Sequence, residues 1–165
     1  MLSIVSSVVK KCGELSSFLG EVAENAILQM IDSVNSLRAL HALLSNCEHR
    51  NSSVRGKVVG FMLVLLMRKG LELRGSRELD TLRMKLSKLL GDSTPEARAG
   101  SRSIVKLLLE QGIYTKSELE QYISADQINK SLKEQPPMYA SDARGGSRYP
   151  YSLTHSLTHS LTHFI

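Results

Sequence analysis

The stretch that decides the fold is Cys47–Gly70, which reads CEHRNSSVRGKVVGFMLVLLMRKG. A short polar turn leads into a segment in which, from Val58 to Met67, only Gly60 interrupts the apolar residues. A helix that is apolar around its circumference must be covered by neighbours on most sides. Ten residues are too few to cross a bilayer, where about 20 are needed. We therefore predict a buried core helix and no membrane insertion.

The same pattern returns in Leu89–Leu109, LLGDSTPEARAGSRSIVKLLL, where an apolar helix end again leads through a polar turn into a second helix. Arg55 and Arg98 take corresponding places in the two stretches and stand 43 residues apart. This spacing lies within the period of about 40–47 residues that HEAT and armadillo repeats show. In such arrays each helix pair buries its apolar face by stacking on the next. The sequence thus predicts an all-α HEAT-repeat solenoid of about three to four antiparallel helix pairs.

Composition limits the possible functions only loosely. A chain of 165 residues, 42% of them hydrophobic, can form one globular domain with a tail. The formal charge of +5 is compatible with nucleic acid, a membrane surface or an acidic protein as partner. The two cysteines, Cys12 and Cys47, form no CxxC motif, which is typical of buried thiols in a reducing compartment. The N-terminus has its basic residues after the apolar ones and does not read as a signal peptide.

Helical spacing of apolar residues places the individual helices. The predicted pairs span residues 2–12 and 18–32, residues 36–46 and 53–69, and residues 78–90 with a partner helix that ends at Gly112. In the helix over 18–32 the expected inward residues are Leu19, Val22, Ala23, Ala26 and Met30. Residues 1–12 would have an exposed apolar face, through which the chain could associate with itself.

Polar turn residues predict where the later helices begin. In the turn after Leu90, Ser93 and Glu96 form a capping box, or Thr94 caps the helix with Pro95 at the first helical position. Two further capping boxes, each opening a short helix, stand at Thr115–Glu118 and Ser124–Gln127. These short helices would cover the open end of the stack, as a solenoid requires.

Regular structure is expected to end near Pro136-Pro137, so we predict a helical domain over 1–134 and a disordered tail over 135–165. Within the tail, residues 152–163 read SLTH three times. The DNA unit TCAC, iterated, encodes this repeat, and our hypothesis is translated simple-sequence DNA. The alternative is a metal site formed by the three histidines at a spacing of four. Because Ser and Thr are weak helix formers and no carboxylate or Cys accompanies them, we expect no metal site.

The sequence contains no recognisable catalytic motif. We find no GxGxxG, GxxxxGK[ST], HExxH or GxSxG, and no nucleophile beside a base. His41 falls within a predicted helix and is most simply a packing or surface residue. The sequence therefore predicts a protein that is not an enzyme and needs no cofactor.

Basic residues gather at the two turns. In a solenoid, equivalent turns of successive repeats lie side by side, so the two basic turns would form one ridge suited to an acidic partner. The alternative interpretation is that the arginines solvate helix ends or tie adjacent repeats together through carboxylates such as Asp92. The residues concerned are His49, Arg50, Asn51, Arg55 and Lys57 at the first turn, and Arg98, Arg102 and Lys106 at the second.

These two turns resemble those of a known family. GDSTPEARAGSRSIVKLL is similar to the GDSxPExRxxGR-type segment of TOG domains in the CLASP and Crescerin groups, and CEHRNSSVRGKVVGFM is similar to the preceding HRN-x-x-VR turn. The resemblance covers about residues 14–125 and points to the Crescerin group, the TOG array regulators of axonemal microtubules, more than to CLASP. On this resemblance the chain corresponds to the C-terminal half of one TOG domain, and it contains no Trp.

The resemblance implies a tubulin- or microtubule-binding module that acts on ciliary, axonemal microtubules and resides in the cytoplasm, the cytoskeleton and the cilium. Two alternatives are a generic HEAT-repeat scaffold for another protein and a truncated isoform with little tubulin affinity. Nucleic acid is not an expected partner, because interleaved aromatic residues and a recognised nucleic-acid-binding fold are missing. The positions that match tubulin-facing turn residues are His49, Arg50, Asn51 and Arg55, while Arg98 and Arg102 match two arginines that act at the surface or between repeats.

Overall fold

The computed structural model describes residues 7–11 and 17–133, and every regular element in these ranges is helical. A helical turn over residues 7–11 precedes the longer elements. These elements are α2 (Ser17–Ser33), α3 (Ser36–Leu44), α4 (Ser52–Lys69), the 3-10 turn η1 (Leu71–Leu73), α5 (Arg77–Leu90), α6 (Pro95–Glu110), α7 (Lys116–Glu120) and α8 (Ala125–Lys133). The predicted all-α class is confirmed. The predicted tail, and residues 2–6 and 12 of the first predicted helix, lie outside the described residues.

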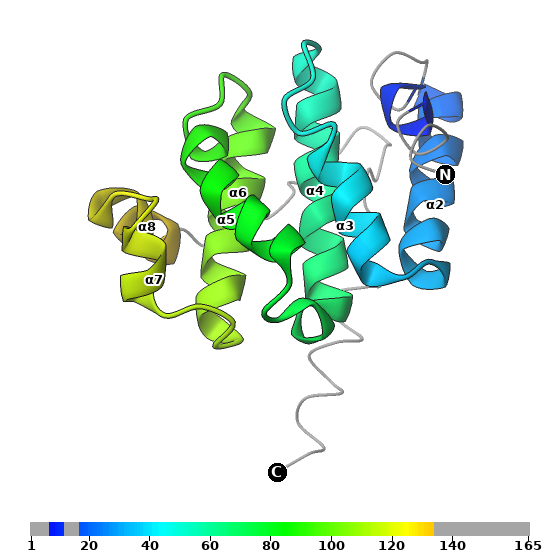
Figure 1. Cartoon of the computed structure of the whole chain (residues 1–165). Coiled ribbons are helices and arrows are strands. Elements are labelled where there is room, and N and C mark those ends of the chain that lie inside the picture. The colour runs from blue at the N-terminus through cyan, green and yellow to red at the C-terminus, as the bar shows by residue number, and fades with distance from the viewer. Residues whose placement is uncertain (1–6, 12–16, 134–165) are drawn as a thin grey trace.

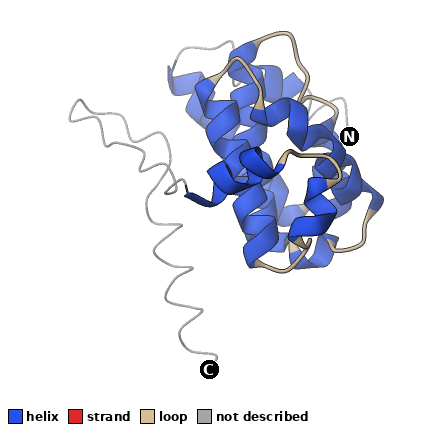
Figure 2. Cartoon of the chain, turned by 90° about the vertical axis from the view of Figure 1, so that its left-hand side faces the viewer, coloured by secondary structure: helices blue, strands red, loops and turns tan. Residues whose placement is uncertain are grey.

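The helices form a stack of antiparallel pairs (Figure 1). α3 pairs with α4 and α5 pairs with α6, and the two pairs contact each other chiefly through α4 and α6. α2 lies beside the first pair, and α8 packs on α6 at the other end. Figure 2 faces the end that α7 and α8 close and shows helices joined by short loops throughout the described chain. This arrangement confirms the predicted HEAT-type solenoid.

α4 is the central helix, as its sequence predicts, although one of its faces is only half-covered. Its fully buried side chains are Val54, Val58, Val59, Phe61, Met62, Leu65 and Leu66. Gly60, Val64 and Met67 are half-buried. On the covered side α6 approaches so closely that a Cβ atom added at Gly100 would lie 2.7 Å from Cγ1 of Val59. Glycine at this position therefore sets the spacing between the two helix pairs.

The structure corrects some of the predicted faces. Among the described side chains of α2, Ile27 and Ile31 are buried, whereas Ala26 is exposed and Val22 is 53% exposed. The predicted stripe is wrong at Val22 and Ala26, because the larger isoleucine side chains occupy the core positions. Ala23 and Met30 pack partly buried against the core as predicted, and the side chain of Leu19 lies outside the described ones. In α5 the predicted inward residues are all buried: Leu79, Leu82, Leu86, Leu89 and Leu90.

The predicted helix starts are largely confirmed. Thr94 is the N-cap of α6 with Pro95 in its first turn, which selects the second of the two predicted alternatives. Thr115 and Glu118 form the predicted capping box of α7. Among the described residues, no helix is both long enough and apolar enough to span a membrane.

Candidate functional site

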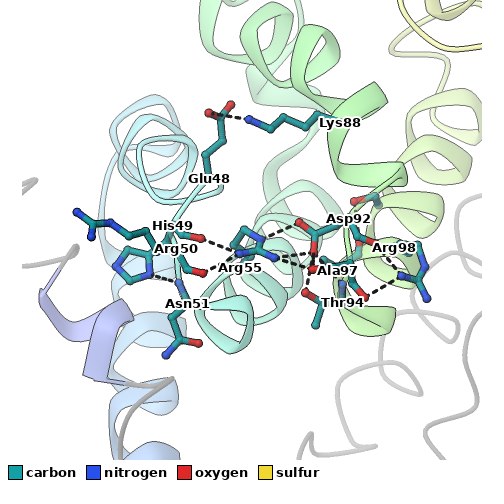
Figure 3. Close-up of polar contacts among 12 residues, drawn as sticks. Glu48, His49, Arg50, Asn51, Arg55, Lys88, Asp92, Thr94, Ala97 and Arg98 are labelled. Atoms are coloured by element: carbon teal, nitrogen blue, oxygen red, sulfur yellow. Dashed lines mark hydrogen bonds and ion pairs between the residues drawn. The ribbon is translucent and has the colours of Figure 1, made fainter.

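Two turns lie next to each other at one edge of the stack, one between α3 and α4 and the other between α5 and α6 (Figure 3). An open depression of about 320 Å³ lies between them. Its polar lining includes Glu48, Arg50, Lys85, Lys88 and Asp92. The predicted juxtaposition of the two basic turns is therefore present in the fold.

Arg55 joins the two turns from the first turn of α4. Its Nε donates to Oδ2 of Asp92 at 2.7 Å and its Nη2 to Oδ1 at 3.0 Å, so the ion pair is bidentate. Nη2 also donates to Oγ of Ser93 at 3.0 Å. Nη1 donates to the carbonyl oxygens of His49 and Arg50 at 2.8 and 3.1 Å. All three nitrogens of Arg55 are thus used within the chain, and the contact with Asp92 is the tie between repeats that the sequence offers as the alternative interpretation.

Asp92 is held as a carboxylate by several donors. Besides Arg55, the backbone N–H of Thr94 donates to its Oδ1 at 2.8 Å and the Thr94 hydroxyl at 2.6 Å. The hydrogen bonds from Arg55, followed by those from Thr94, hold the pKa of Asp92 well below its usual range, against the opposing effect of burial. Because the Thr94 hydroxyl is engaged with Asp92, α6 begins without a side-chain capping bond of its own.

Arg98 repeats one part of this arrangement in the second turn. Its Nη1 donates to the carbonyl oxygens of Asp92 and Ser93 at 2.6 and 3.0 Å. These acceptors precede Arg98 by six and five residues, as His49 and Arg50 precede Arg55. The repeat detected in the sequence is therefore a repeat in structure, in which an arginine on the first turn of the second helix fixes the turn before it.

Asn51 and His49 shape the first turn. Asn51 is the N-cap of α4, and its Oδ1 accepts from the backbone N–H of Ser53 at 2.9 Å. Its own backbone N–H donates to Nδ1 of His49 at 3.1 Å. One polar atom of each side chain therefore forms a hydrogen bond within the turn itself. Both residues are half-buried.

Arg50 is the exposed residue of this turn. Its guanidinium points away from Arg55 in Figure 3. Within the described residues its side chain has no hydrogen-bond or ion-pair partner, while its carbonyl oxygen is the acceptor for Arg55. Arg50 is thus a positive charge presented to solvent on a backbone that Arg55 fixes.

The other predicted residues lie further from the depression. Lys57, half-buried on α4, forms an ion pair with Glu24 and so ties α4 to α2. Arg102 lies half-buried on α6, one turn beyond Arg98. The structure therefore does not bring Lys57 into the depression, whose basic lining comes partly from α5 instead.

Sequence reasoning missed the contribution of α5. Nζ of Lys85 lies 2.7 Å from Oε1 of Glu48, and Nζ of Lys88 lies 3.2 Å from Oε2. The Lys88 side chain is 70% exposed. Hydrogen bonds from the two lysines lower the pKa of Glu48, and Glu48 raises the pKa of Lys85. The signal was the pair of lysines three apart on the polar face of α5, but only the packing of α3 against α5 brings them to the first turn.

The chemistry available at this edge is that of binding. Among the described residues, no three His, Cys, Asp or Glu side chains lie close enough together to hold a metal ion. Burial raises the pKa of the Cys47 thiol beside the depression, which keeps it protonated and unreactive at neutral pH. Exposed cations on a rigid backbone are suited to an acidic surface.

The chain matches the model of a known protein family. The family model described as CLASP N terminal matches residues 1–133, a range that includes every described helix. No solved structure matches the chain. The matched range contains both turns and the whole stack from α2 to α8.

Proposed function

The chain belongs to the CLASP N-terminal family of microtubule-associated, TOG-like helical modules, and we propose that it binds tubulin without catalysing a reaction. The observation that carries the proposal is the edge of paired turns, where the exposed Arg50 and Lys88 border a depression of about 320 Å³. Tubulin has an acidic surface, and complementary charge speeds association and fixes orientation. We name this feature the turn edge and define it by residues 45–51, residues 91–94, Lys85 and Lys88.

Within the turn edge we assign contact with tubulin to the exposed residues and support to the internally bonded ones. Arg50 and Lys88 are exposed, and the half-buried His49 stands beside Arg50. Arg55 and Asn51 hold the first turn in place through the contacts described above. This division predicts that mutating a contact residue weakens binding at unchanged stability, whereas mutating a supporting residue changes both.

The other residues that the sequence predicted at the turns support the fold in this proposal. Lys57 is held by Glu24 and stabilises the packing of α2 on α4. Arg98 fixes the second turn through its Nη1 contacts, and Arg102 lies one turn deeper along α6. We therefore expect substitution at Lys57 to act on stability more than on tubulin affinity.

The likeness of both turns to the Crescerin group supports a finer proposal, namely that the tubulin concerned is that of ciliary, axonemal microtubules. This proposal places the protein in the cytoplasm, at the cytoskeleton and in the cilium. Its test is the location of a tagged full chain in ciliated cells. Enrichment along the axoneme supports the proposal, whereas labelling of cytoplasmic microtubules alone, with cilia unlabelled, refutes it and leaves the wider proposal standing.

Binding itself is tested by co-sedimentation of the full chain with microtubules. Arg50→Glu reverses an exposed charge on the turn edge, and Arg77→Glu makes the same change at the start of α5, at the opposite edge. We expect Arg50→Glu to weaken binding about tenfold or more, because a like charge then faces an acidic surface, and Arg77→Glu to weaken it much less. Circular dichroism should show equal helix content. Equal losses for both variants, or no binding by the parent chain, would refute the proposal.

A further inference from the structure

Arg55 and Arg98 hold their turns in the same way but differ on the other side of the guanidinium. In Arg55, Nε and Nη2 together grip the carboxylate of Asp92 at 2.7 and 3.0 Å. In Arg98, only Nη1 donates, to the carbonyl oxygens of Asp92 and Ser93. Across residues 7–11 and 17–133, Nε and Nη2 of Arg98 have no acceptor. We call the pair of donors Nε and Nη2 the fork of the guanidinium. The fork of Arg55 is filled by a carboxylate, and the fork of Arg98, one repeat later, is open.

The last helix pair explains why the second fork is open. Asp92 lies three residues before the first residue of α6, and the residue three before the first residue of α8 is Tyr122. A tyrosine cannot supply a carboxylate. Instead, Cζ of Arg83 lies over the Tyr122 ring, 4.9 Å from the ring centroid. α7 also has only 5 residues, so the α7–α8 turn stays well below the turn edge in Figure 1. The described repeats therefore offer Arg98 nothing in place of Asp92.

We propose that Arg98 is a carboxylate-binding position, whose Nε and Nη2 receive an aspartate or glutamate side chain in a bidentate contact. The guanidinium is preorganised for this, because its Nη1 is already fixed on two carbonyl oxygens and little further rotamer freedom is lost on binding. The contact between Arg55 and Asp92 shows within the same chain that a carboxylate fits this geometry. The inference rests on the proposed function, since it names the chemical group with which an acidic partner engages Arg98, beside the turn edge.

The carboxylate has two conceivable sources. One is an acidic segment of the partner protein, and the other is the part of this chain outside the described residues, which contains Glu14, Glu134 and Asp142. Both give the same chemistry at Arg98. A triple variant, Glu14→Gln with Glu134→Gln and Asp142→Asn, removes the second source and so distinguishes the two.

The test is a nuclear magnetic resonance titration of the arginine Nε–H signals in the full chain. The probe is a synthetic peptide of eight glutamates, and an uncharged peptide of eight glutamines serves as the control ligand. The signal of Arg98 is assigned by its disappearance in Arg98→Lys, and that of Arg55 in Arg55→Lys. Arg55 is the internal reference, because its Nε–H is already bound to Asp92.

We expect the Arg98 signal to move saturably with the glutamate peptide alone, while the Arg55 signal stays in place. If the chain's own carboxylates fill the fork, the Arg98 signal resembles that of Arg55 before titration and becomes titratable only in the triple variant, which supports a carboxylate of internal source. An Arg98 signal that does not respond to the peptide in either protein overturns the proposal.

Microtubule co-sedimentation separates this inference from the proposed function. Arg98→Lys keeps the charge and loses the fork, so we expect about fivefold weaker binding, as for the loss of one well-placed ionic contact. Binding that is equally tight in Arg98→Lys refutes the role of the fork in tubulin binding but leaves the proposed function intact. An absence of binding by the parent chain removes the proposed function, while the peptide titration still decides the chemistry of Arg98.

Discussion

Replacing Arg55 by alanine should destabilise the whole stack, because this one side chain makes five hydrogen bonds and joins two helix pairs. The Arg55 and Asp92 side chains are 16% and 10% exposed, which places the pair between surface and buried ion pairs. Exposed pairs contribute at most about 1 kcal/mol, and breaking a buried one costs about 3–5 kcal/mol. We therefore expect the free energy of unfolding to fall by about 2–4 kcal/mol.

The assay is urea unfolding of the full chain, followed by circular dichroism. Arg50→Ala is the matched control, because its exposed side chain has no partner in the described part of the chain, and we expect a change within about 0.5 kcal/mol. Arg55→Lys keeps the charge but cannot form the bidentate contact, so it should show most of the loss. A loss below about 0.5 kcal/mol in Arg55→Ala would refute the view that Arg55 is a supporting residue.

The same pair gives the fold a defined response to acid. The pKa of Asp92 is lower in the folded chain than in the unfolded one, where it is about 3.9. The stabilisation is therefore complete above that value and is lost as the pH falls below it. We expect Asp92→Asn to be less stable than the parent chain at pH 7 and the difference to shrink below about pH 4. A difference that stays constant across this range would show that the Asp92 charge does not contribute.

Three further predictions concern the scaffold. Gly100→Ala should lower the free energy of unfolding by urea by about 1–3 kcal/mol, because the new Cβ would lie 2.7 Å from Cγ1 of Val59. Adding Val59→Ala should recover little more than the part of this loss that comes from the steric clash. A Gly100→Ala variant as stable as the parent chain would contradict the close approach. Asn35→Ala should cost about 1 kcal/mol, because Asn35 caps α3, and Asn35→Asp should restore it; equal stability of all three proteins would contradict the cap. In a Cys12→Ser background, Cys47 should react with a thiol reagent only at the rate of unfolding, because it is 1% exposed, whereas rapid labelling in the native state would contradict its burial.

Periodicity was enough to predict the stack but not its detailed packing. Arg55 and Arg98, 43 residues apart, take the same place in two successive helix pairs, and their contacts to preceding carbonyl oxygens have the same offsets. The apolar face of α5 was also predicted correctly, because leucines mark it without ambiguity. In α2, the predicted stripe left out Ile27 and Ile31, which are buried where α2 packs beside α3 and α4.

The candidate site was harder to predict, because sequence position does not tell a supporting residue from an exposed one. Arg50 and Arg55 are both arginines of one turn, yet one faces solvent and the other is enclosed by acceptors from two repeats. The contacts of Glu48 with Lys85 and Lys88 join residues 37 and 40 positions apart and depend on the register of α3 against α5. No local pattern in the sequence encodes that register.

The most direct test of the tubulin-binding account is hydrogen–deuterium exchange of the full chain with and without saturating tubulin. We predict slower exchange at the turn edge, in residues 45–51 and 91–94, and unchanged exchange at the opposite edge, in residues 70–76 and 111–115. Protection confined to the opposite edge or to the half-covered face of α4, with both turns unaffected, would contradict the account.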